Sequence, residues 1–178
     1  AALLIGAGMI MLLAHNWEAL SRPVRSVVSF LPLLAGQFLA GYSLLRRRGS
    51  AVWREGAAIF LTLSIGASIS LISQTWQISG ALDTFLLTWL LLALPLVYLL
   101  HSTGAAILYM AGVCAWTASA QYYTGSAMLN WLLIAAVLPH GGILLRKEPE
   151  SPRAVLFISS VTLYLLICLG TVLEKAVP

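Results

Sequence analysis

The feature that most constrains this chain is a succession of long apolar segments separated by short polar ones. Of its 178 residues, 60% are hydrophobic and 9% are charged, whereas about 25% of the residues of a soluble domain are charged. So few charged side chains cannot cover a surface that faces water. A segment that crosses lipid must satisfy its own backbone hydrogen bonds, which only helices and closed barrels achieve. Because the apolar runs lack the two-residue alternation of barrel strands, the sequence predicts an all-α fold.

The apolar segments have the lengths expected of membrane spans. A spanning helix needs about 20 mainly apolar residues, because the hydrocarbon core is about 30 Å thick. Seven segments fit or nearly fit: residues 1–14, 24–45, 57–73, 84–100, 104–120, 127–145 and 154–173. We therefore predict one multi-pass transmembrane bundle of about seven spans over residues 1–178. The first segment is short and opens on Ala rather than Met, so we expect a fragment of a longer chain; a cleaved signal peptide is the alternative.

The distribution of basic residues predicts the orientation, since Lys and Arg are enriched in cytoplasmic loops. The connections after the second, fourth and sixth segments hold seven of them: Arg46, Arg47, Arg48, Arg54, Arg146, Lys147 and Arg153. The other connections and the C-terminus hold three, namely Arg22, Arg25 and Lys175. We therefore place the N-terminus and the first group in the cytoplasm.

Polar side chains gather in the connections that this topology places on the outer side. Glu18 and Asp83 are the acids among them, and His15 titrates near neutral pH. The sequence predicts an outward-facing ligand pocket lined by His15, Asn16, Trp17, Glu18, Gln74, Trp76, Gln77 and Asp83. The alternative is that these side chains cap helices and bind water and headgroups, as interfacial loops commonly do.

A second candidate is His140, which lies between Pro139 and Gly141 inside the sixth segment. An ionisable side chain within a span is costly, and this cost indicates a functional role. The alternative is that His140 reaches the inner headgroups, because Arg146 follows only about 9 Å further along the helix.

Several classes of function find no support in the sequence. It contains no His-Glu-x-x-His zinc helix, no Gly-x-Ser-x-Gly elbow and no phosphate-binding loop, so enzyme is the least supported class. We predict no cofactor and no metal site, because the histidines are scattered and both cysteines, Cys114 and Cys168, lie in apolar segments. Nucleic acid is not an expected partner, because the basic residues form short clusters between spans.

Four motifs in the first half of the chain carry a family resemblance. They are Ala14-His15-Asn16-Trp17-Glu18, the Leu-Leu-Arg-Arg-Arg-Gly stretch at 44–49, Trp53-Arg54-Glu55, and Ser73-Gln74-Thr75-Trp76-Gln77-Ile78-Ser79-Gly80. With these motifs the chain resembles the predicted bacterial membrane proteins grouped as domain of unknown function 2157. The last motif is similar to the family's Gln-x-Tyr-x-x-Ser-Gly signature, although the family often carries His at the position of Gln77.

This resemblance implies a bacterial inner-membrane location and a cytoplasmic segment before the first helix, and it implies no activity. Two functional hypotheses remain open. A transporter-like or ligand-sensing domain would have a cavity that reaches below the interface. A structural or partner-binding module would be a closed bundle with an exposed packing stripe. The expected partners are the lipid bilayer and either another membrane protein or a second copy of this chain.

Overall fold

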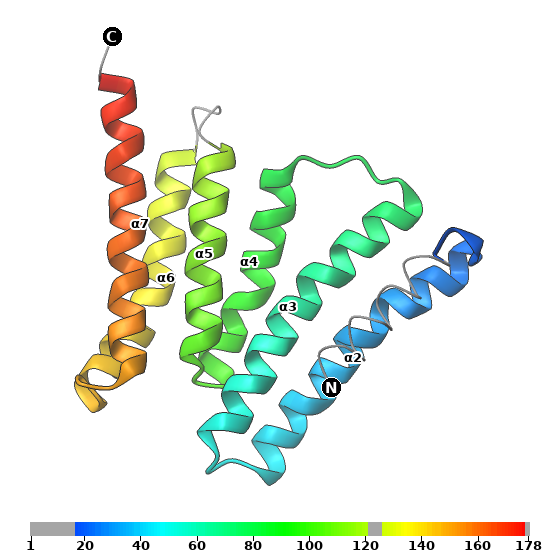
Figure 1. Ribbon diagram of the computed structural model, residues 1–178, viewed down its shortest axis with the longest axis horizontal. Coiled ribbons are helices and arrows are strands. Elements are labelled where there is room, and N and C mark those ends of the chain that lie inside the picture. The colour runs from blue at the N-terminus through cyan, green and yellow to red at the C-terminus, as the bar shows by residue number, and fades with distance from the viewer. Residues whose placement is uncertain (1–16, 121–125, 177–178) are drawn as a thin grey trace, which may run out of the picture.

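The computed structural model describes residues 17–120 and 126–176, and all regular secondary structure within them is helical (Figure 1). This confirms the all-α prediction. The predicted span at 1–14 lies outside the described residues. The elements in order are η1 (Trp17–Ala19), α2 (Arg22–Arg46), α3 (Ala51–Trp76), α4 (Leu82–Leu99), α5 (Thr103–Ala120), α6 (Ser126–Lys147) and α7 (Pro152–Ala176).

Four of the described helical segments are long and apolar enough to cross a membrane. They are α2, α3, α4 and Leu129–Lys147 of α6. Thr103–Ser119 of α5 and Pro152–Ile167 of α7 are shorter apolar helical stretches. The described part of the chain therefore contains four candidate membrane spans, and the count of seven stays a prediction.

Helix α3 begins six residues earlier than the apolar segment at 57–73 predicts. The hydroxyl of Ser50 at its N-cap accepts a hydrogen bond from the backbone N–H of Trp53. Such a cap satisfies one of the free N–H groups of a helix start. The six added residues include Arg54 and Glu55, and charged residues such as these are not expected in an apolar span.

Successive helices run in opposite directions (Figure 1). Helix α2 packs on α3, and α5 contacts α3, α4, α6 and α7. Towards the α3–α4 connection, the pair α2 and α3 leans away from the other four helices (Figure 1). The connections that follow α2, α4 and α6 lie together at the opposite end. The alternation therefore brings the seven predicted cytoplasmic Lys and Arg residues to one end.

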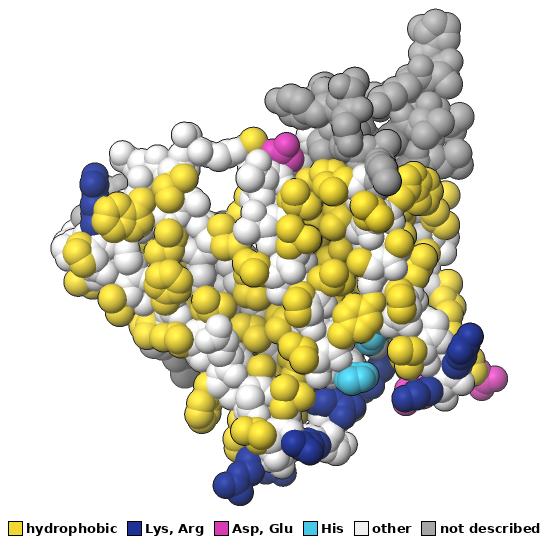
Figure 2. All heavy atoms as spheres, turned by 180° about the vertical axis from the view of Figure 1, so that it is seen from behind, with side chains coloured by type: hydrophobic (Ala, Val, Ile, Leu, Met, Phe, Trp, Pro, Cys, Tyr) yellow, Lys and Arg dark blue, Asp and Glu magenta, His cyan; other side chains and the backbone are white. Residues whose placement is uncertain are grey.

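Large apolar side chains cover the outer surface. Phe38, Leu45 and Val52 are 74%, 73% and 78% exposed. Figure 2 shows hydrophobic side chains across the middle of one face, with Lys and Arg side chains gathered at the end that carries the α2–α3 and α6–α7 connections. An apolar surface of this extent requires lipid or protein cover.

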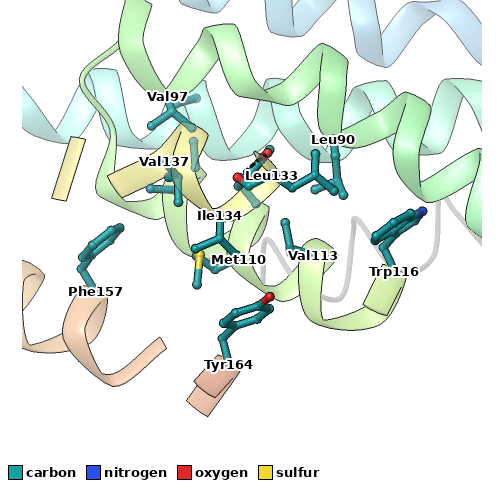
Figure 3. Close-up of a cluster of buried hydrophobic side chains, with 14 of the residues drawn as sticks. Leu90, Val97, Met110, Val113, Trp116, Leu133, Ile134, Val137, Phe157 and Tyr164 are labelled. Carbon is teal, nitrogen blue, oxygen red and sulfur yellow. Dashed lines mark hydrogen bonds between the residues drawn. The ribbon is translucent and has the colours of Figure 1, made fainter. Parts of the chain in front are cut away.

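The main hydrophobic core lies among α4, α5, α6 and α7. Figure 3 shows its side chains pointing toward one another from all four helices. Tyr164 of α7 is fully buried there, and the Tyr109 hydroxyl of α5 donates a hydrogen bond to the Leu133 carbonyl of α6 over 3.0 Å. The labelled members are Leu90, Val97, Met110, Val113, Trp116, Leu133, Ile134, Val137, Phe157 and Tyr164.

Small residues and interhelical hydrogen bonds join α2 to α3 and α3 to α4. A Cβ at Gly36 would lie 3.1 Å from the Cα of Leu61, so the glycine permits a close approach of the two backbones. The Ser68 hydroxyl donates to the Ser29 carbonyl over 2.8 Å, and the Trp89 indole donates to the Thr62 carbonyl over 2.8 Å. Membrane helices associate through such contacts because apolar burial alone offers little gain in lipid.

The carboxylate of Glu55 joins α3 to the start of α5. It accepts hydrogen bonds from the Thr103 N–H over 3.0 Å, from the Gly104 N–H over 2.9 Å and from the Ser102 hydroxyl. The first N–H groups of a helix lack partners within it and carry partial positive charge. Glu55 therefore caps α5 from a different helix and fixes the position of the α4–α5 connection.

Candidate functional site

A groove lies between α3 and α4 and opens toward their connection. Two adjoining cavities of about 680 Å³ and 550 Å³ form it, and both are lined by Ile69, Ser73 and Ile78. We name their combined surface the α3–α4 groove. It also includes Phe30, Leu33 and Gln37 of α2, and Leu92 and Leu96 of α4.

The polarity of the groove changes along its length. The part toward the middle of the helices is lined mainly by Phe, Leu and Ile side chains, with Gln37 and Ser68 among them. The part near the α3–α4 connection is also lined by apolar side chains, but it holds most of the hydroxyl and amide groups of the groove: Ser70, Ser73, Gln74, Ser79, Thr84 and Thr88. The lining residues carry no formal charge. The groove is thus mainly apolar and uncharged along its length, with its hydroxyl and amide groups concentrated at the mouth.

The end of α3 shapes this mouth. Gln77 has a left-handed backbone with φ of 51°, its N–H donates to the Gln74 carbonyl, and the Ile78 N–H donates to the Ser73 carbonyl over 2.9 Å. This pattern is a Schellman motif, which ends a helix and turns the next residue back over its last turn. It places Ile78 at the groove, where it lines both cavities.

The structure separates the predicted pocket residues that it describes. Gln74 lines the α3–α4 groove. The Trp76 indole instead contacts α2, donating to the Ser26 hydroxyl over 3.0 Å. Asp83 accepts the Thr84 N–H over 2.7 Å at the start of α4, and Gln77 is the exposed C-cap of α3.

The remaining members of the predicted pocket lie near or beyond the start of the described chain. Trp17 is half-buried in η1. His15 and Asn16 lie outside the described residues, as does the side chain of Glu18. The sequence prediction missed Ser70, Ser73, Thr84 and Thr88, although their spacing of three to four residues within each helix marks one face of that helix.

The polar groups that line the groove can form hydrogen bonds. Ser, Thr and Gln side chains donate and accept hydrogen bonds without titrating near neutral pH. Among the side chains that the structure describes, no three of His, Cys, Asp or Glu converge as metal ligands would.

The sequence model of a family described as predicted membrane proteins, domain of unknown function 2157, matches residues 1–106. The chain belongs to this family. No curated protein matches the chain, and no solved structure matches it. The match confirms the family predicted from the four motifs, and together with the apolar helices it establishes a membrane protein.

The part of the chain matched to domain of unknown function 2157 contains the whole groove. It spans α2, α3 and α4 and ends within the first turn of α5. Every lining residue of the groove, from Phe30 to Leu96, falls inside it. The Glu55 cap of α5 is also included.

Proposed function

We propose that this membrane protein binds a neutral amphipathic ligand in the α3–α4 groove and acts as a ligand-sensing membrane domain. The ligand has one acyl chain, which lies against the apolar part of the groove, and an uncharged hydroxylated head. Gln74 and the hydroxyl groups around it hold that head.

The change of polarity along the groove is the observation that carries this proposal. An acyl chain is favoured where Phe, Leu and Ile line the groove, and a charged head would find no countercharge among the lining residues. Hydroxyl and amide groups suit a neutral head because they pair with it in both directions. Polar groups that fix an apolar molecule in an apolar cleft are the usual design of a small-molecule site.

The finer details of location belong to the same proposal. The protein lies in a bacterial inner membrane with about seven spans and its N-terminus in the cytoplasm, so the mouth of the groove faces outward. That His15, Asn16, Trp17, Glu18, Trp76, Gln77 and Asp83 contribute further contacts to the ligand stays a prediction.

Binding is favoured over transport and over a purely structural role. Transport is disfavoured because side chains fill the space among α4, α5, α6 and α7, as expected of a static scaffold. The open groove between α3 and α4 supports a ligand site more than it supports the closed bundle of a packing module.

A photoreactive monoacylglycerol tests the proposal. We expect ultraviolet light to attach this probe to the α3 and α4 peptides of the full chain in detergent, and unlabelled monoacylglycerol to compete. Thr88→Trp places an indole in the mouth and should weaken labelling about tenfold, which corresponds to about 1.4 kcal/mol of binding free energy. Peptide mass spectrometry measures the yield at each helix.

Thr162→Trp is the matched control. Thr88 and Thr162 are both exposed, and each hydroxyl donates to the carbonyl four residues earlier, but Thr162 lies on α7 and not in the groove. The control should keep full labelling at α3 and α4. Equal labelling of all helices, or equal losses in both variants, would refute a site in the groove.

A further inference from the structure

A separate cavity lies at the opposite end of the molecule from the mouth of the groove. It has a volume of about 360 Å³ and lies where α3 begins, α6 ends and α7 begins. Its ionisable lining residues are Arg54, His101, His140, Lys147, Glu148 and Arg153. Figure 2 shows histidine side chains beside Lys and Arg side chains at this end. The function proposed for the groove makes no use of this cavity.

The imidazole of His140 is fixed in the wall of this cavity. His140 is 7% exposed. Its ring packs edge-on against the rings of Tyr98 and Phe157, with centroid-to-centroid distances of 6.4 Å and 6.3 Å. The Nε2 atom is buried and has no hydrogen-bond partner among the described residues. Buried polar atoms nearly always have a partner, so this nitrogen marks a place for one.

Arg54 adds a second unused nitrogen. Its Nη1 donates to the Arg48 carbonyl over 2.6 Å, whereas its Nε is buried with no hydrogen-bond partner in the described chain. The adjacent acid, Glu55, already accepts three hydrogen bonds from the start of α5. The oxygens of the Glu55 carboxylate therefore already have hydrogen-bond partners at the start of α5.

The cavity carries excess positive charge. Arg54, Lys147 and Arg153 contribute three cations, and Glu148 is the one acid among the lining residues. These residues come from three helices and the turn between α6 and α7, so the cations converge from different directions. Convergent Arg and Lys side chains bind phosphate groups through short, charge-assisted hydrogen bonds.

We infer that this cavity binds a phosphate group, with Arg54, Lys147 and Arg153 as its countercharges and His140 Nε2 as a further hydrogen-bond partner. The cavity lies at the basic end of the bundle, at the depth where the helices end. Basic cavities between membrane helices take anionic headgroups. A lipid headgroup and a soluble phosphate offer the same chemistry, and the experiment separates them.

Titration calorimetry of the full chain in dodecyl maltoside, a detergent without phosphate, provides the test. Inorganic phosphate is the first probe and dihexanoyl phosphatidic acid the second. We expect the double variant Lys147→Gln/Arg153→Gln to bind about tenfold more weakly, a loss of about 1.4 kcal/mol. Arg46→Gln/Arg47→Gln removes the same charge from two exposed residues at this end that do not line the cavity, and should bind as the wild type does.

A second readout follows the imidazole itself. In protein labelled with ¹⁵N-histidine, either probe should shift the resonance that is missing from His140→Gln. Binding of both probes, or of the lipid alone, supports the inference and distinguishes a general phosphate site from a headgroup site. The inference is overturned if neither probe binds, if the control variant weakens binding equally, or if the His140 resonance does not move.

Discussion

Glu55→Ala is expected to lower the stability of the fold by about 2–4 kcal/mol, because it removes one acceptor from three donors in a partly buried place. Ser102 and Thr103 are 0% and 4% exposed, so water cannot readily replace the carboxylate. The start of α5 would also lose the negative charge that complements its dipole. Thermal unfolding in detergent, followed by tryptophan fluorescence, measures the change in midpoint.

Two variants make this result interpretable. Glu55→Gln keeps one acceptor oxygen and should fall between wild type and Glu55→Ala. Glu150→Ala removes an exposed acid from the α6–α7 connection and should leave the midpoint unchanged. If Glu55→Ala unfolds at the same temperature as Glu150→Ala, the cap contributes nothing to stability.

Gly141→Ala is the second change for which we expect a large effect, about 1–3 kcal/mol of destabilisation from overpacking. A Cβ at Gly141 would lie 2.1 Å from Cε1 and 2.6 Å from Cζ of the Phe157 ring. Phe157 is 3% exposed, so its ring cannot move away without displacing other core residues. The added methyl group should force α6 and α7 apart. A lower unfolding midpoint in detergent would report this.

The next residue provides the matched control. A Cβ at Gly142 would meet nothing within 4 Å. Alanine favours a helix over glycine by about 1 kcal/mol, so Gly142→Ala should be neutral or stabilising. Equal midpoints for the two alanine variants would contradict the close contact between Gly141 and Phe157.

The helices could be predicted from the sequence because the hydropathy of a segment is a sum over many residues. The segment at 104–120 differs by one residue from α5, and that at 24–45 from α2 by two at its start. The start of α3 could not be predicted from hydropathy. The early part of α3 contains Arg54 and Glu55, and Glu55 is held there by a partner in α5 that is 48 residues away in the sequence.

The candidate site was predicted only in part, for a related physical reason. Gln74 was predicted as a site residue because polar residues gather near the helix ends. Hydropathy does not show, however, in which direction a side chain points. Trp76, two residues later, faces α2 and bonds Ser26, 50 residues away. The groove also depends on the inclination of α3 relative to α4 (Figure 1), which results from packing between helices. His140 could be identified from the sequence because an ionisable side chain is costly within a membrane span. Its cavity could not, because the lining residues Arg54 and Arg153 come from other helices.

The threading of the chain through the bilayer underlies both proposed sites, and cysteine labelling tests it most directly. Gly49→Cys and Gly80→Cys place single thiols in the α2–α3 and α3–α4 connections, where a Cβ meets nothing within 4 Å. Cys114→Ala and Cys168→Ala provide the background. In bacterial spheroplasts, a membrane-impermeant maleimide should label Gly80→Cys directly and Gly49→Cys only after permeabilisation. Labelling of both thiols from the same side would contradict α3 as a membrane span.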